Sequence, residues 1–169
     1  LLLVEVNCMQ CELVKPTYQL DQKDFLFLHY LRQNARMGLT QLSRKTGVPI
    51  STIHHRLKMY ASSHLIKRYT ALVDFSRLGY GIRTFMLITA KKQQKDSLKA
   101  FLMACPIVNK LMKINHGYDF FVDAAFKTMQ EVDRFRELLC QEYGARDVKM
   151  HYIIEELKYE GFFLDQPYP

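Results

Sequence analysis

The sequence predicts an α+β protein of two small domains, a helical one followed by one with four strands and two helices. Three observations support this: apolar residues recur at helical spacing up to about Ser62, strand-like segments dominate from Gly79 onward, and glycines separate the segments. The 169 residues, about half of them apolar, suffice for two buried cores. We expect an extension over 1–19, a first domain over 20–64, a linking strand and linker over 65–80, a second domain over 81–160 and a tail over 161–169.

The first helix is predicted over Gln22–Gln33. Asp21 is a plausible N-cap, and Asp24 supplies an acidic residue three positions later. Apolar residues then recur at helical spacing at Phe25, Leu28 and Leu31.

Two further helices complete the first domain. One is predicted over Thr40–Thr46, with Leu39 and Leu42 facing inward and Gly47 ending it. Pro49 suits the first turn of the next, which runs to about Ser62. Two helices joined by a short glycine-containing turn are typical of a helix-turn-helix, whose second helix enters the DNA major groove.

The remaining segments predict a wing or linking strand and then a ferredoxin-like domain. Strands are expected at Leu65–Val73, Ile82–Ala90, Val108–Asn115, Phe120–Phe126 and Val148–Leu157, with a His116-Gly117 turn before the fourth. Helices are marked by the apolar sets Leu98, Phe101, Leu102, Cys105 and Val132, Phe135, Leu139. The order βαββαβ gives an antiparallel sheet with both helices on one face. We expect a second copy to cover the other face, because an exposed apolar sheet favours association.

Charge is concentrated in the first half of the chain. Residues 1–80 carry eleven Lys/Arg against five Asp/Glu, whereas residues 81–169 carry thirteen against twelve. No acidic residue lies between Asp24 and Asp74, a stretch that holds eight basic residues. A segment of one sign attracts a polyanion, and double-stranded DNA is the leading candidate.

The stretch VPISTIHHRLKMY, residues 48–60, contains the predicted recognition helix. At about 100° per residue, His55 points away from the face formed by Ile53 and Leu57, and His54 diverges from it by about 100°. The two histidines therefore do not face each other, and a shared metal is not expected. The predicted DNA-binding residues are Arg44, Lys45, Ser51, Thr52, His54, His55, Arg56 and Lys58, with Arg56 and Lys58 placed for phosphates. A solvated basic helix with no such role is the alternative.

The cysteines indicate reduced thiols in a cytoplasmic protein. Cys8 and Cys11 form a C-x-x-C that is half of a zinc site, but no second ligand pair completes it, so no metal or cofactor is expected. Cys105 and Cys140 stand among apolar residues and are interpreted as core residues. Nothing in the sequence indicates secretion or a membrane span.

From Leu20 to Lys158 the chain resembles the Lrp/AsnC, or feast/famine, transcriptional regulators. The likeness rests on Leu20-Asp21 with Asp24, on Gly47-Val48 followed by Ser51-Thr52-Ile53, and on Gly117-Tyr118-Asp119 in the second half. The resemblance implies DNA binding, dimerisation through the sheet, assembly into tetramers or octamers, and an amino-acid effector bound between dimers near His116, Gly117, Tyr118 and Asp119. Where the family usually has glycine, this chain has His116, which leaves the effector open, and His64, which bears on the entry into the linking strand.

The sequence leaves two other functions open. Sirohaem- and haem-pathway decarboxylases resemble the same two-domain architecture, and His116 with Tyr118 keeps that alternative open, although the arginine pair of that family is not visible. An architectural DNA binder without an effector is a third possibility. No hydrolytic motif or phosphate-binding glycine loop is present, and no enzyme activity is expected.

Overall fold

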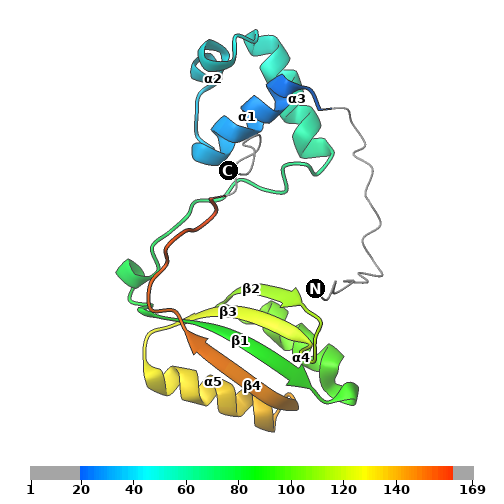
Figure 1. The fold of residues 1–169 in the computed structure, drawn as a ribbon, viewed down its shortest axis with the longest axis vertical. Helices are drawn as coiled ribbons and strands as arrows, with labels where there is room; N and C mark the ends of the chain where they lie inside the picture. The colour runs from blue at the N-terminus through cyan, green and yellow to red at the C-terminus, as the bar shows by residue number, and fades with distance from the viewer. Residues whose placement is uncertain (1–19, 162–169) are drawn as a thin grey trace, which may run out of the picture. The chain divides into compact units, whose positions relative to one another are not determined.

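The computed structural model describes residues 20–161, which form two units. Residues 20–71 with 160–161 make up the first, and Leu72–Tyr159 the second. Figure 1 shows helices alone in the first unit and a sheet with helices in the second. Each unit has its own apolar core, and each is described by itself below.

The first unit consists of three helices: α1 (Gln22–Gln33), α2 (Leu39–Thr46) and α3 (Ile50–Ser62). All three predicted helices are confirmed to within one residue at their starts. Their buried core consists of Phe27, Leu31, Leu42, Val48 and Ile53. The turn between α2 and α3 depends on Gly47, whose φ of 68° lies in the left-handed region that favours glycine.

Helix α1 begins with the predicted cap. The Asp21 side chain accepts a hydrogen bond from the Asp24 N–H at 2.8 Å, and the Asp24 carboxylate accepts one from the Asp21 N–H at 2.8 Å. This reciprocal capping box satisfies two backbone donors that the helix leaves free. The buried stripe is shifted from the prediction, however: Phe27 is fully buried, whereas Phe25 is half-buried.

The predicted linking strand at Leu65–Val73 is wrong for the single chain. The structure gives this segment no strand, and the four strands of residues 20–161 all belong to one sheet elsewhere. Tyr69, Leu72 and Val73 are about half exposed or more. A strand exists only where a neighbouring strand accepts and donates its backbone hydrogen bonds, and β-forming residues alone do not supply that neighbour.

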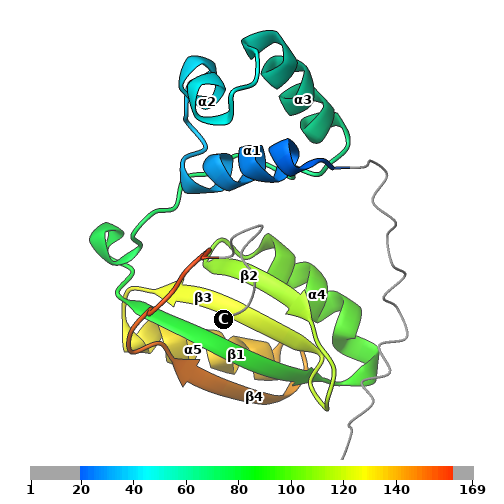
Figure 2. The same ribbon diagram turned by 45° about the horizontal axis from the view of Figure 1, so that its top comes forward.

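The second unit is an antiparallel sheet in the order β2-β3-β1-β4. Its strands are β1 (Ile82–Ala90), β2 (Val108–Lys113), β3 (Phe120–Phe126) and β4 (Ala145–Tyr152), and its helices are α4 (Lys95–Ala104) and α5 (Met129–Gln141). Two short 3₁₀ turns, Ser76–Leu78 and Lys92–Gln94, precede β1 and α4. The predicted βαββαβ order is confirmed, and Figure 2 shows both long helices against the same face of the sheet.

The helix-covered face of the sheet holds the core of this unit. Met86 and Ile88 of β1 and Val122 of β3 are fully buried, and they pack with Leu98 of α4 and Phe135 of α5. Cys105 packs partly against this core, but Cys140 is exposed on α5, so its predicted core position is wrong. The helical spacing correctly predicted that Leu139 is buried. Cys140 is the next residue along the helix, so its side chain points about 100° away from that of Leu139.

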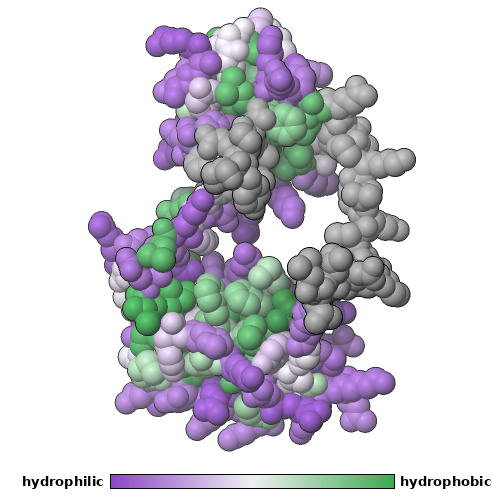
Figure 3. All heavy atoms as spheres, viewed as in Figure 1, coloured by the Kyte–Doolittle hydropathy of each residue, from purple (hydrophilic) through white to green (hydrophobic). Residues whose placement is uncertain are grey.

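The opposite face of the sheet, which we call the open face, has no helix over it. Strand alternation places Phe85 and Leu87 of β1 and Phe121 of β3 there, and the Phe85 and Phe121 ring centroids lie 5.1 Å apart. Arg83 and Asp123 form an ion pair on the same face, at 3.2 Å. Figure 3 shows hydrophobic side chains gathered over the strands, and an apolar surface of this kind is typical of a protein–protein contact.

Replacing His64 by glycine is expected to stabilise the first unit by about 0.5–1 kcal/mol. The left-handed conformation costs a residue with a side chain about 1–2 kcal/mol, and glycine avoids this cost. Part of the gain is lost, because glycine also increases the conformational entropy of the unfolded chain. His64 is exposed and has φ of 59°. Urea unfolding would measure the gain. His64→Ala is the matched control, since it removes the imidazole and keeps the Cβ. An equal gain in both variants would contradict the backbone explanation.

Candidate functional site

One face of α3 is polar and exposed. Ser51, His54, His55 and Lys58 are exposed and Thr52 is half-buried, whereas Ile53 and Tyr60 on the opposite side are fully buried. The helix is held in place by Ile53, which packs in the core with α1 and α2. The orientation predicted for the two histidines therefore agrees with their exposure, and α3 presents short hydroxyls, imidazoles and an ammonium group outward.

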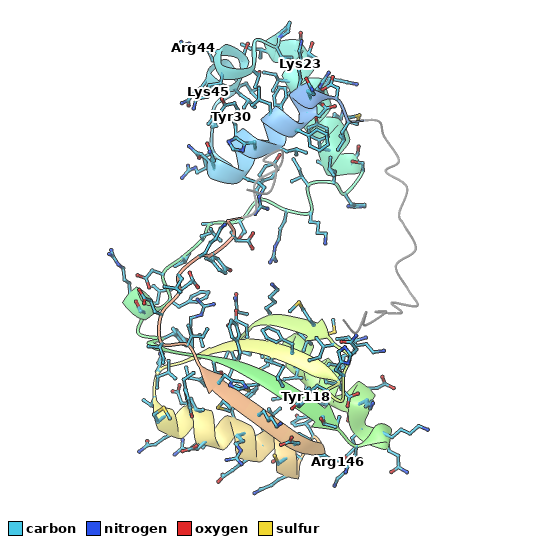
Figure 4. The ribbon with its side chains drawn as sticks, viewed as in Figure 1. Lys23, Tyr30, Arg44, Lys45, Tyr118 and Arg146 are labelled. Atoms are coloured by element: carbon cyan, nitrogen blue, oxygen red, sulfur yellow. The ribbon has the colours of Figure 1, made fainter. Side chains whose placement is uncertain are left out.

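Helix α2 adds two basic residues to this unit. Arg44 and Lys45 are exposed in its last turn (Figure 4). The Lys45 ammonium lies 4.7 Å from the centroid of the Tyr30 ring of α1, a cation–π contact that orients the side chain without neutralising it.

Arg56 differs from the other predicted DNA-binding residues. Its guanidinium donates to both Asp21 carboxylate oxygens at 3.0 Å and to the Asp24 carboxylate, and the Tyr60 hydroxyl donates to Asp24 as well. Arg56 was predicted to contact phosphates, and in the structure its guanidinium, which is mostly buried, joins α3 to the start of α1. We call Asp21, Asp24, Arg56 and Tyr60 the α1–α3 clamp.

The electrostatics of the clamp favour its charged form. The hydrogen bond from Arg56 holds the pKa of the Asp21 carboxyl far below its usual range, and the Asp24 N–H adds to this effect. Burial, followed by the hydrogen bond to Asp24, raises the pKa of the Tyr60 hydroxyl. At neutral pH Asp21 is therefore a carboxylate and Tyr60 a neutral phenol.

The first unit is expected to lose stability in acid because of Asp21. Its folded pKa is depressed, so its stabilising contribution is present above the unfolded pKa of about 3.9 and is lost as pH falls through the folded value. Melting temperatures between about pH 5 and pH 2 would measure this. Asp21→Asn keeps an equivalent N-cap and should show a shallower pH dependence. An unchanged slope in that variant would contradict the assignment.

The loop His116–Asp119 lies between β2 and β3. His116 and Gly117 have φ values of 59° and 88°, and consecutive positive values are those of a type I′ turn, as the dipeptide predicted. The loop is also attached to β1, since the Thr89 hydroxyl donates to the Gly117 carbonyl at 2.9 Å.

Asp119 is fully engaged within the chain. Its carboxylate accepts a hydrogen bond from the Ala90 N–H at 2.8 Å and pairs with the Lys95 ammonium, and its own N–H donates to the Ile88 carbonyl at 2.8 Å. Burial raises the pKa of this carboxyl, but Lys95 and the Ala90 N–H outweigh burial, and the net pKa is lowered. Asp119 therefore fastens the loop to β1 and α4, and Lys95 compensates its charge.

Tyr118 is paired with a residue that sequence reasoning missed. The Lys149 ammonium lies 5.5 Å from the centroid of its ring, and a hydrogen bond with the Tyr118 hydroxyl raises the pKa of Lys149. Lys149 faces Leu87 across the β1–β4 pair. No local pattern indicates this contact, because it depends on the register of two strands that are distant in the sequence.

Within residues 20–161 no three potential ligand residues are grouped so as to hold a metal ion, and no helix there is long and apolar enough to cross a bilayer. The Cys8 and Cys11 pair lies outside the described residues.

Comparisons with known proteins agree with this two-part arrangement. A family model described as winged helix-turn-helix DNA-binding matches residues 20–67, and one described as Lrp/AsnC ligand binding domain matches residues 83–161. The HTH-type transcriptional regulator FL11 of Pyrococcus furiosus is 30% identical over 120 residues, which cover 71% of this chain and 80% of that protein. The glutamate uptake regulatory protein of Zymomonas mobilis is 26% identical over 144 residues, 83% of this chain and 88% of that protein.

Solved structures show the same fold. A transcriptional regulator of Neisseria meningitidis in complex with L-methionine superposes with a TM-score of 0.79 at 22% identity, covering 83% of this chain and 94% of that one. LrpC of B. subtilis gives a TM-score of 0.76 at 21% identity, covering 83% and 99%. The chain is therefore a member of the Lrp/AsnC family of DNA-binding transcriptional regulators.

Proposed function

We propose that this regulator recognises specific sites on double-stranded DNA through the exposed face of α3, and that a small molecule at the loop His116–Asp119 modulates that binding. The observation that carries the DNA contact is the exposed polar face of α3, opposite the buried Ile53 and Tyr60, in a stretch without acidic residues from 25 to 73. Such a face suits a major groove lined by phosphates.

The residues of the interface take different roles in this proposal. Ser51, Thr52 and His55 are short or planar polar groups suited to base edges, while the flanking His54 packs or touches a phosphate. Lys58, together with Arg44 and Lys45 of α2, supplies phosphate contacts. Arg56 acts indirectly, because the α1–α3 clamp fixes the angle at which α3 is presented.

His55→Ala is expected to relax sequence preference, whereas Lys58→Ala should weaken binding to all sequences about alike and reduce the salt slope by about one. Selection of bound sequences followed by anisotropy titrations at several salt concentrations would separate the two effects. Lys99→Ala, which removes an exposed charge from α4, is the matched control and should leave DNA affinity nearly unchanged. Indistinguishable behaviour of His55→Ala and Lys58→Ala would contradict the assigned roles.

The effector in this proposal is an amino acid or a closely related small molecule. Support comes from the Neisseria relative, whose structure contains L-methionine, and from the Zymomonas relative, which is named for glutamate uptake. Genome-wide selection of bound DNA, followed by competition with individual amino acids, tests both halves of the function. Stoichiometric binding of haem or sirohaem, with decarboxylation of the bound tetrapyrrole, would instead support the decarboxylase alternative. We propose no catalytic role for this protein.

Self-association completes the proposal. We expect a homodimer formed through the open face of the sheet, and further assembly into tetramers or octamers. Phe85, Leu87 and Phe121 supply an apolar surface there, and Arg83 with Asp123 places both signs of charge on it, which suits a two-fold contact between identical faces. The regulator would act in the cytoplasm, with DNA as its partner.

A further inference from the structure

The side chains of the loop His116–Asp119 leave a ligand no uncompensated negative charge. The carboxylate of this loop, Asp119, is paired with the Lys95 ammonium and also accepts from the Ala90 N–H, and the Gly117 carbonyl accepts from Thr89. An α-ammonium group is held best by a carboxylate whose charge is not already balanced. The side chains of this loop therefore do not favour such a group.

Cations surround the loop on more than one side. The Lys149 ammonium of β4 lies 5.5 Å from the centroid of the Tyr118 ring. Lys113, at the end of β2, is near enough to lower the pKa of Asp119, together with Lys95. Arg146 is exposed near the start of β4, at the same end of the sheet as Tyr118 (Figure 4). Two carboxylates stand beside these cations. Asp119 is paired with Lys95, and the charge of Asp147 contributes to the raised pKa of Lys149.

His116 adds a donor at the tip of the turn. The imidazole is exposed and stands on a backbone with φ of 59°, where glycine would be less strained. His64 has the same φ of 59° in the other unit, so its replacement measures the effect of such a histidine on stability. This backbone costs an L side chain about 1–2 kcal/mol, and at His116 it places an exposed imidazole on the tip of the loop.

We propose that the effector is a small dicarboxylic acid that does not require an α-ammonium group, with one carboxylate held by the Lys149 ammonium and the Tyr118 hydroxyl and the other end met by His116. Charge-assisted hydrogen bonds from lysine and tyrosine suit carboxylate oxygens, and they need no acceptor from the loop. This inference rests on the proposed function, because it assumes that the loop is the effector site.

The test is calorimetric titration of the full chain with glutarate, 2-oxoglutarate, L-glutamate, L-glutamine, L-leucine and L-lysine. We expect glutarate and 2-oxoglutarate to bind at least as tightly as L-glutamate. They should bind at least about tenfold more tightly than L-glutamine, L-leucine or L-lysine, because these three lack the second carboxylate and lose one charge-assisted contact. Tighter binding of a neutral or cationic amino acid at this loop would overturn the inference and leave the proposed function intact. Absence of binding by all six, and by the remaining amino acids, would overturn both.

Substitutions test whether the dicarboxylate binds at the loop His116–Asp119. Lys149→Gln should weaken 2-oxoglutarate at least about tenfold, whereas Arg134→Gln, which removes an exposed charge from α5, should not. His116→Gly should stabilise the fold as His64→Gly does, yet weaken the dicarboxylate several-fold, a change that a purely structural role would not produce. Full affinity in both Lys149→Gln and His116→Gly would refute the assignment of the dicarboxylate to this loop.

Discussion

Replacing Asp24 by asparagine is expected to lower the free energy of unfolding of the helical unit by about 3 kcal/mol. The Asp24 side chain is only 7% exposed, and it receives the Arg56 guanidinium, the Tyr60 hydroxyl and the Asp21 N–H. Asparagine keeps the shape but removes the charge, so Arg56 loses its most buried counter-charge. Removal of one member of a buried ion pair typically costs about 3–5 kcal/mol, and the lower value fits because Asp21 still pairs with Arg56.

Hydrogen exchange of the α1 and α3 amides during urea unfolding would measure this loss separately from the second unit, which is useful in a chain without tryptophan. Asp21→Asn is the matched control, because Asp21 is half exposed and asparagine is an equally good N-cap; its cost should stay below about 1 kcal/mol. Equal losses in the two variants would show that the buried pair is not what matters. DNA affinity of Asp24→Asn should fall even where the helices remain folded, because α3 loses a tether to α1.

Replacing Phe121 by aspartate should convert the proposed dimer into a monomer at micromolar concentration. Phe121 lies on the open face, against Phe85 and opposite Leu87 of β1 and Met112 of β2. A carboxylate in an apolar contact costs several kcal/mol without a partner, and a two-fold interface places it there twice. The dissociation constant should therefore rise by about three orders of magnitude or more.

Sedimentation equilibrium across a range of concentrations would measure the change. Met129→Asp is the matched control: this methionine is 48% exposed at the start of α5, where a carboxylate is favoured by the helix dipole. A dimer retained in Phe121→Asp but lost in Met129→Asp would place the contact on the helices instead. Circular dichroism of both variants would check that the sheet remains folded.

Local signals predicted much of the fold. Helix α1 was predicted with its observed bounds because its cap is formed by residues three positions apart, and β1 and β3 were predicted with theirs because apolar residues and turns delimit them. The last strand was not: β4 runs from Ala145 to Tyr152, earlier than the predicted Val148–Leu157. Its end follows from pairing, since Tyr152 lies opposite Thr84 near the start of β1, and beyond it the Ile153 N–H still donates to the Arg83 carbonyl at 2.9 Å.

In the candidate site, too, features that depend on local sequence were predictable and those that depend on tertiary packing were not. Helical periodicity was sufficient to orient His54 and His55, because each direction depends only on the position along α3. The partner of Arg56 was not predictable, since Asp21 and Asp24 lie more than thirty residues earlier and meet it only through the packing of α1 against α3. A basic residue at a phosphate position and one in an internal ion pair have the same appearance in the sequence.

The attachments of Asp119 bear on how a ligand signal would propagate. This one residue joins the loop to the end of β1, through the Ile88 carbonyl and the Ala90 N–H, and to the start of α4, through Lys95. A displacement of its backbone acts on all three bonds, because they share this one residue. A ligand that moved the hairpin would therefore act on the end of β1 and the start of α4 together.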